Sequence, residues 1–160
     1  MAFDKELMSD LTIATPPAAF QPIPIGDGFS SSFGPLYGCP RNGVLVLGFR
    51  VLAQHVNHNG VCHGGPLASF ADMQAFAAQF AANLRHNVTP TISLDVKYLA
   101  SATQGQWIES ETKLLKTTRR MLFTQSIVAA DRVPILHCAG IYKIGIPAEG
   151  AVDMLSVFHG

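Results

Sequence analysis

Charge is scarce in this sequence, and neither sign prevails. Only 14% of its 160 residues are charged, and 11 acidic residues balance 11 basic ones. A protein that binds nucleic acid through phosphate contacts normally presents a basic surface. The balance therefore argues against a nucleic-acid partner. So little charge also leaves apolar surface, which we expect another subunit to cover.

Cysteine is rare as well, and the three cysteines show no paired spacing. An odd number of thiols without a disulfide pattern is typical of reduced cysteines in a cytoplasmic protein. The start of the chain, Met1 to Glu6, lacks the basic residues and the apolar run of a signal peptide. We therefore expect a cytoplasmic location.

The sequence also lacks a long uninterrupted apolar run. The stretch from Pro66 to Leu84 has the length of a membrane span, but Asp72, Gln74, Gln79 and Asn83 interrupt it. Polar groups of this kind are costly in lipid. We interpret the stretch as one long buried helix and expect no membrane partner.

The 160 residues fit a single domain large enough to bury a core. Residues 1–43 are rich in Pro, Gly and Ser, which predicts an arm over the surface with room for a short helix near Asp4–Leu11. The core is expected over residues 44–146, and a tail with Gly and Pro over 147–160.

Five stretches of the core have the patterns of β-strands. Residues 43–52 form a nearly continuous apolar run, which indicates a buried strand. Thr91 to Leu99 alternates between polar and apolar residues, as a half-buried antiparallel strand does. Three more strands are expected at 106–115, 120–129 and 134–144. Hairpin turns at 116–119 and 131–132 are expected to join them. The sequence therefore predicts an α+β fold in which one antiparallel sheet wraps an apolar helix.

The most informative segment is the turn ahead of that helix, Asn57-His58-Asn59-Gly60-Val61-Cys62-His63-Gly64-Gly65-Pro66. Gly64 and Gly65 permit unusual backbone conformations and leave their N–H groups open to a ligand. Pro66 suits the first helical position, where its missing N–H costs nothing. Amides at a helix start bind an anion or a polarised carbonyl. With Asp72 two turns further on, this arrangement suits acyl transfer.

These residues resemble those of the hotdog-fold acyl-CoA thioesterases, specifically the PaaI-like branch of the phenylacetate pathway. The resemblance covers residues 36–143 and rests on Asn57-x-x-Gly60-x-x-His63-Gly64-Gly65, on Asp72 and on the strand Ser93 to Leu99. It implies a hotdog fold, with an antiparallel sheet around one long central helix. It also implies sites shared between subunits of a homodimer, which often pairs into a homotetramer.

The resemblance implies an acyl-CoA substrate, with no cofactor because coenzyme A belongs to the substrate itself. Gly64, with Gly65 beside it, then donates its amide to the thioester carbonyl. The partner subunit's Asp72 serves as nucleophile or general base, and the two roles remain open. Asn57 orients the carbonyl or the attacking water, and His63 supports the loop and the sulfur end of the thioester.

Two further roles follow from the same resemblance and from charge. Thr91 is expected to help hold the attacking water. Arg119 and Arg120, with Lys116, form a small basic cluster that suits the phosphates of coenzyme A. The hairpin before Arg119 often carries a glycine in this family, whereas this chain has Thr117-Thr118.

Each assignment has a plainer structural alternative. Asp72 and Thr91 would then face solvent, Asn57 would only form a turn, and His63 would only hold the loop. The basic cluster would be a solvated hairpin tip. A metal site at His55, His58, Cys62 and His63 lacks any standard ligand spacing, so we expect no metal.

Two other functions fit the same fold. A hotdog hydratase or dehydratase pairs a catalytic histidine with a helix carboxylate through a different signature containing proline, which is not found here. A non-catalytic acyl-CoA binding protein would bind thioesters without turnover.

Overall fold

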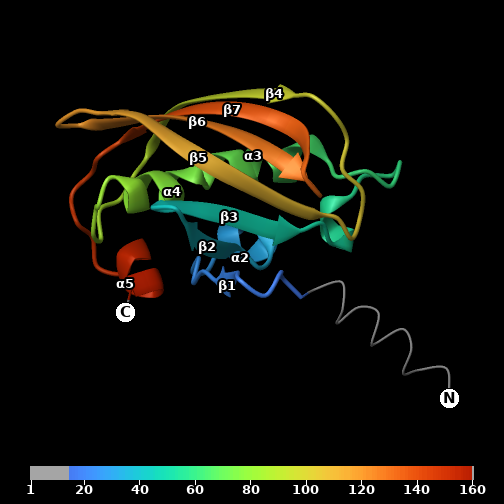
Figure 1. Ribbon diagram of the computed structural model, residues 1–160, viewed down its shortest axis with the longest axis horizontal. Helices are drawn as coiled ribbons and strands as arrows, with labels where there is room; N and C mark the ends of the chain where they lie inside the picture. Colours follow the sequence, from blue (N-terminus) through green and yellow to red (C-terminus); the bar gives the residue numbers. More distant parts are fainter. Residues whose placement is uncertain (1–14, 160) are drawn as a thin grey trace, which may run out of the picture.

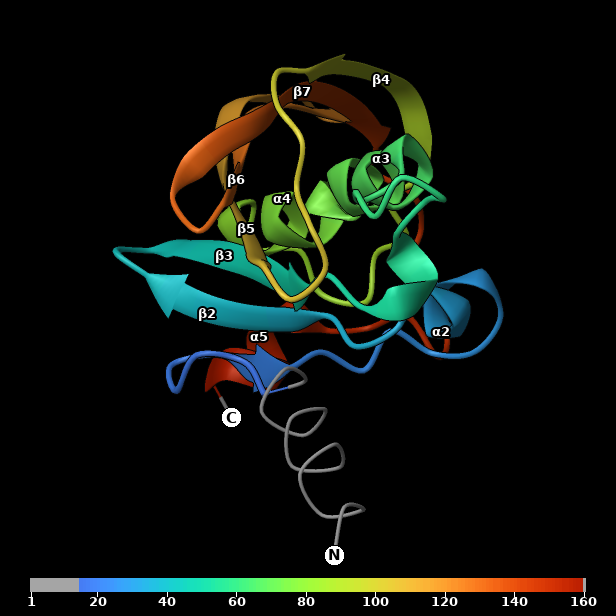
Figure 2. The ribbon, with the colours of Figure 1, turned by 90° about the vertical axis from the view of Figure 1, so that its right-hand side faces the viewer.

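The computed structural model describes residues 15–159, which form a seven-stranded antiparallel sheet curved around two helices (Figures 1 and 2). Across the sheet the strands are β1 (Gln21–Pro22), β2 (Tyr37–Arg41), β3 (Val44–Arg50), β5 (Trp107–Thr117), β6 (Met121–Ala130), β7 (Val133–Lys143) and β4 (Thr91–Tyr98). All five strands expected from the sequence are present. The predicted α+β architecture is therefore confirmed, whereas the short helix expected near Asp4–Leu11 lies outside the described residues.

The single long helix expected from Pro66 to Leu84 is in fact two helices. Helix α3 covers Gly64–Asp72 and helix α4 covers Gln74–Ala81, with a break at Met73. The carbonyls of Phe70 and Ala71 accept hydrogen bonds from the side chains of Gln74 and Tyr142. Side chains that enter the backbone hydrogen-bond ladder are a recognised cause of helix kinks. The expectation of one continuous helix was therefore wrong at Met73.

The expected surface arm contains two strands of the sheet, β1 and β2. Strand β2 pairs with β3 through a hairpin whose turn residues, Asn42 and Gly43, have φ of 50° and 81°. Both values are those of the tight type I′ turn that an Asn-Gly pair favours. The short helix α2 (Phe29–Phe33) follows β1, and its Phe33 is buried in the core. The expectation of an arm ending near residue 43 was therefore wrong for β1 and β2.

Two further short helical elements lie along the described chain. A 3₁₀ helix, η1 (Ala53–His55), leads from β3 into the turn ahead of α3. Helix α5 (Met154–His159) lies in the expected tail, and its Met154 and Leu155 are buried. No helix among residues 15–159 is long and apolar enough to span a membrane.

Strand β4 forms one edge of the sheet and pairs only with β7 among the described strands. It was expected to be half-buried, and Leu94 and Val96 do pack against the core. Ile92 and Tyr98, however, are 54% and 53% exposed. An edge with free backbone groups and exposed apolar side chains is a template for pairing with another strand.

Candidate active site

The carboxylate of Asp72 is fixed between the end of α3 and the start of β4. Thr91 donates its hydroxyl to Asp72 Oδ1 over 2.6 Å. At the other end of the same two elements, Tyr98 donates its hydroxyl to the carbonyl of Gly64 over 2.9 Å. Helix α3 and strand β4 therefore run side by side in opposite directions, tied together at both ends.

Asp72 and Thr91 border a cavity of about 610 Å³. Ser69 lies beside them on α3, and Met73 and Phe76 supply apolar lining. Ligand pockets in proteins commonly have volumes of about 300–1,000 Å³ with a few polar groups on an apolar lining. The cavity is thus large enough for an acyl group next to a carboxylate.

Part of the cavity wall comes from segments that the sequence did not assign to the site. Phe29 of α2 lines the cavity from the amino-terminal side, and residues 150–152 line it from the segment before α5. Phe29 is largely exposed outside this contact. No sequence signal marks these segments, because their place depends on how both ends of the chain fold back onto the helices.

Helix α3 begins at Gly64, two residues before Pro66, which was expected at the first helical position. His63 is the N-cap of the helix, and its Nδ1 accepts a hydrogen bond from the Gly65 N–H over 3.0 Å. The Gly64 N–H has no hydrogen-bond partner within the described part of the chain. Gly64, Tyr98 and Leu99 border a hollow of about 300 Å³. The Gly64 amide is therefore not used within the described chain, whereas the Gly65 amide is already used by His63.

Gly64 and Asp72 lie at opposite ends of α3 and do not meet within one chain. Eight residues separate them, which corresponds to about 12 Å along a helix. One thioester carbonyl cannot contact both groups of the same chain. Within the single chain, the predicted site residues therefore form two separate groups. Thr91 lies next to Asp72 at one end of α3, and His63 lies next to Gly64 and Gly65 at the other.

Asn57 shapes the turn ahead of the helix. Its side-chain oxygen accepts a hydrogen bond from the Asn59 N–H over 2.9 Å, and its carbonyl accepts one from Gly60. The turn-forming role of Asn57 is therefore present in the structure. Its predicted contact with the thioester carbonyl or with water remains a prediction.

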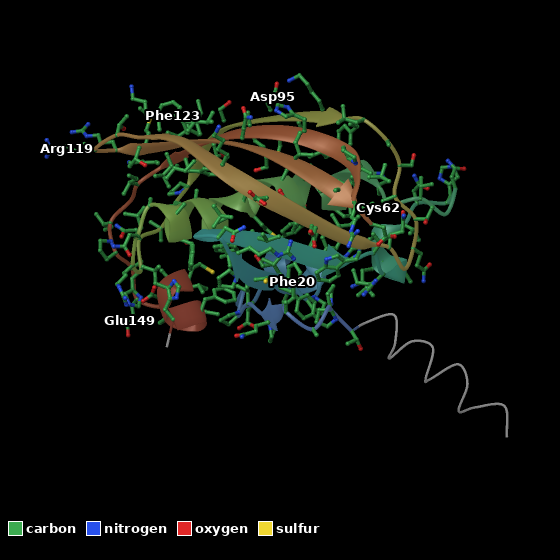
Figure 3. All side chains as sticks on the ribbon, viewed as in Figure 1. Phe20, Cys62, Asp95, Arg119, Phe123 and Glu149 are labelled. Carbon is green, nitrogen blue, oxygen red and sulfur yellow. The ribbon has the colours of Figure 1, made fainter. Side chains whose placement is uncertain are left out.

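Arg119 and Arg120 lie at the exposed tip between β5 and β6, where Arg119 projects at the end of the molecule opposite Cys62 (Figure 3). In this turn the hydroxyl of Thr118 accepts hydrogen bonds from the N–H groups of Arg120 and Met121. The single chain does not bring the basic cluster to the Gly64 turn. Contact with the phosphates of coenzyme A remains a prediction.

Two residues of the rejected metal cluster have structural roles. His55 is buried and bonds through both ring nitrogens to the backbone, accepting from Leu52 and contacting the carbonyl of Phe33. Burial raises the pKa of the Cys62 thiol to about 11, so this thiol is protonated at neutral pH and is a poor ligand and nucleophile. No group of three metal-ligating side chains is found among residues 15–159.

Comparison with known proteins agrees with this geometry. The model of the thioesterase superfamily matches residues 59–132, from the turn ahead of α3 through β6. The matched segment contains the Gly64 turn, Asp72 and Thr91, so this part of the chain is similar to the thioesterase superfamily. A protein of Pseudomonas aeruginosa described as a candidate esterase is 25% identical to it over 130 residues, which are 80% of this chain and 96% of that relative.

Solved thioesterase structures have the same fold as this chain. A mutant of the phenylacetic acid degradation protein PaaI from Thermus thermophilus matches with a TM-score of 0.62 and 21% identity, over 74% of this chain and 99% of that one. Zebrafish thioesterase superfamily member 2 matches with a TM-score of 0.66 and 21% identity, over 76% and 90% of the two chains. The hotdog fold predicted from the sequence is thereby confirmed.

Proposed function

We propose that this protein is an acyl-CoA thioesterase of the PaaI-like branch, which hydrolyses acyl or aryl-acyl coenzyme A to a carboxylic acid and free coenzyme A. The observation that carries the proposal is the Asp72 carboxylate, held by Thr91 at the border of a cavity of about 610 Å³. Two structural neighbours from streptococci were solved with coenzyme A or acetyl-CoA bound, which supports a coenzyme A thioester as the substrate.

The proposed active unit is a homodimer formed through β4. Antiparallel pairing of two β4 edges about a twofold axis sets the Thr91 end of one strand beside the Tyr98 end of the other. Since Asp72 is tied to Thr91, and Gly64 to Tyr98, this pairing carries Asp72 toward the partner subunit's Gly64. The exposed Ile92 and Tyr98 favour such pairing. We further propose that two dimers form a homotetramer.

The chemistry follows from the groups that meet in this dimer. The Gly64 N–H, at the start of α3, stabilises the negative charge that develops on the thioester oxygen, as in other oxyanion sites. Asp72 either takes a proton from water or attacks the carbonyl directly. Asn57 and His63 are proposed to orient the reacting groups, and Arg119 and Arg120 to bind phosphates. Three free, buried cysteines support a cytoplasmic location.

The proposal is tested by free-thiol release from a panel of aliphatic and aryl acyl-CoAs. Asp72→Asn is expected to keep the fold and to lower turnover by about 10²–10⁴-fold, the usual effect of losing a general acid–base group. Glu111→Gln is the control, because Glu111 is an exposed carboxylate on β5, outside the cavity lining and away from the β4 edge. Parental turnover in Asp72→Asn would show that Asp72 is misassigned. Binding of the whole panel without thiol release by the parent would indicate a binding protein instead.

A further inference from the structure

The two residues immediately before Asp72, Phe70 and Ala71, have backbone carbonyls that accept hydrogen bonds from buried side chains. Gln74 donates its side-chain amide to the carbonyl of Phe70 over 2.9 Å. Tyr142, on β7, donates its hydroxyl to the carbonyl of Ala71 over 3.4 Å. In a continuous helix these two carbonyls would accept backbone N–H groups four residues later. The break at Met73 therefore has a specific chemical cause.

The amide of Gln74 is oriented by the sheet. Gln74 is only 1% exposed, and its Oε1 accepts the hydroxyl of Thr112, on β5, over 2.6 Å. The Thr112 hydroxyl also lies 2.9 Å from that of Ser126, on β6. Buried polar groups are costly unless they are hydrogen-bonded. This chain of bonds thus fixes both ends of the Gln74 side chain between the helix and two strands.

Tyr142 reaches the helix because the sheet leaves space for its ring. It is 0% exposed, and a Cβ atom on Gly140 would lie 2.5 Å from its hydroxyl. Any side chain at position 140 would therefore displace the ring. Burial and the nearby negative charge of Asp72 both raise the pKa of Tyr142, so the hydroxyl keeps its proton and remains a donor. The hydroxyl of Tyr142 is thus an uncharged hydrogen-bond donor near the Asp72 carboxylate.

The break determines where Asp72 lies. It allows α3 to follow β4, while α4 turns to pack against β3 and β5. Asp72 is the last residue before the break, and Thr91 reaches it from the start of β4. Without the two side-chain bonds, the carbonyls of Phe70 and Ala71 are free to accept backbone N–H groups and the helix can straighten. A straightened helix would move the carboxylate relative to Thr91.

We infer that Gln74 and Tyr142 are positioning residues of the thioesterase, which hold the helix break at Met73 and thereby place the Asp72 carboxylate against Thr91 and the cavity. The inference rests on the proposed function. Neither residue touches the substrate, and both act through Asp72. A misplacement of about 1 Å in a reacting group can cost about 10² in rate.

The first test compares Gln74→Met and Tyr142→Phe with the parent in free-thiol release. Both variants keep the size of the side chain and remove the group that donates to the helix. We expect kcat to fall about 10–100-fold with KM unchanged, because the cavity and the coenzyme A contacts remain. Ser126→Ala is the matched control, since it removes a buried hydroxyl from the same network but leaves both bonds of Gln74. It should keep nearly parental kcat.

The second test repeats each substitution in the Asp72→Asn background and measures the residual turnover. If Gln74 and Tyr142 act through Asp72, neither substitution lowers that turnover further. An equal loss in both backgrounds, or parental kcat in the single variants, would overturn the inference. Should Gln74→Met fail to fold, Tyr142→Phe still decides the question. Parental turnover of Asp72→Asn would instead contradict the proposed function itself, so the two failures are distinguishable.

Discussion

Thr91 donates its hydroxyl to the Asp72 carboxylate across the space between the first residue of β4 and the last residue of α3, with 2.6 Å between the two oxygens. This bond engages Oδ1 of the carboxylate, and both residues border the cavity. Thr91 was expected from the sequence to hold the attacking water. Its contact in the single chain is with the carboxylate, so we propose that it orients the base.

The first prediction concerns this hydroxyl. Thr91→Val keeps the shape of the side chain and removes the donor, so the Asp72 carboxylate loses its orientation. We expect kcat to fall about tenfold, equivalent to the roughly 1.4 kcal/mol of a hydrogen bond to a charged group. Thr91→Ser keeps the donor and should retain most of the activity. Parental activity in the valine variant, with a loss in the serine variant, would show that the methyl group, not the hydroxyl, matters.

The second prediction concerns the amide of Gly64. Gly64→Pro removes this N–H at the first helical position, where proline is well tolerated. The preceding residue, His63, has φ −64° and ψ 149°, which also suits a following proline. We expect kcat to fall about 10²–10³-fold, the typical cost of one oxyanion donor. The measurement is free-thiol release.

Gly64→Ala is the control for that substitution. Its added Cβ would lie 3.3 Å from the ring of Tyr98, so it introduces a similar close contact while keeping the N–H. The alanine variant should therefore remain much more active than the proline variant. If both lose the same activity, the contact with Tyr98 and not the lost donor explains the effect.

The sequence predicted the parts of the fold that local patterns determine. The alternation in residues 91–99 and the apolar run at 43–52 predicted β4 and β3, because burial on one or both faces leaves a direct pattern. Asp131 and Arg132 were predicted to turn, and both have positive φ. Strand β2 was missed, although Asn42-Gly43 ahead of an apolar run is a strong hairpin signal.

Other features depend on contacts between distant residues and leave no local pattern. The bonds that we infer to hold the break at Met73 involve Tyr142 and Thr112, which follow it by many residues and lie on the sheet. The cavity wall at residues 150–152 likewise depends on the fold of the chain end. The motif indicated Gly64 and Asp72 as candidate site residues, and the distance of about 12 Å between them follows from the helix.

The third prediction concerns the segment that closes the cavity. Asp153 caps α5 by accepting the N–H of Leu155, and it also pairs with Arg85. Asp153→Ala removes the cap, which typically costs about 1 kcal/mol, and loosens the adjacent residues 150–152. We expect KM for long acyl-CoAs to rise while kcat/KM for acetyl-CoA stays the same.

Arg85→Ala is the control, because it removes a largely exposed partner of Asp153 and leaves the cap of α5 in place. Chain-length preference should change in Asp153→Ala and not in Arg85→Ala. An unchanged preference in both would mean that the acyl group does not reach this wall.

The fourth prediction concerns pH and the buried thiol of Cys62. Burial raises its pKa from 9.0 to about 11, so the folded state holds the proton more tightly than the unfolded chain does. Below about pH 9 both states are protonated, and the thiol has no effect on the pH dependence. From about pH 9 to 11 only the unfolded thiol ionises, so the free energy of unfolding falls.

Denaturant titrations across this range check the prediction. Cys62→Ala is expected to be less stable than the parent at neutral pH because it leaves a cavity. Its further loss between about pH 9 and 11 should be smaller than the parent's by roughly 1–2 kcal/mol, on the scale of 1.4 kcal/mol per pKa unit. Parallel pH profiles would show that the Cys62 thiol titrates normally.

The central claim, that Asp72 and Gly64 act together only across a subunit boundary, is tested by mixing two inactive variants. Asp72→Asn and Gly64→Pro are unfolded and refolded together, and each is refolded alone as a control. A mixed dimer contains one site with both groups intact. Since half of randomly formed dimers are mixed, free-thiol release should recover to about a quarter of the parental rate. A mixture no more active than its separate components, in protein shown to be dimeric, would contradict a site shared between subunits.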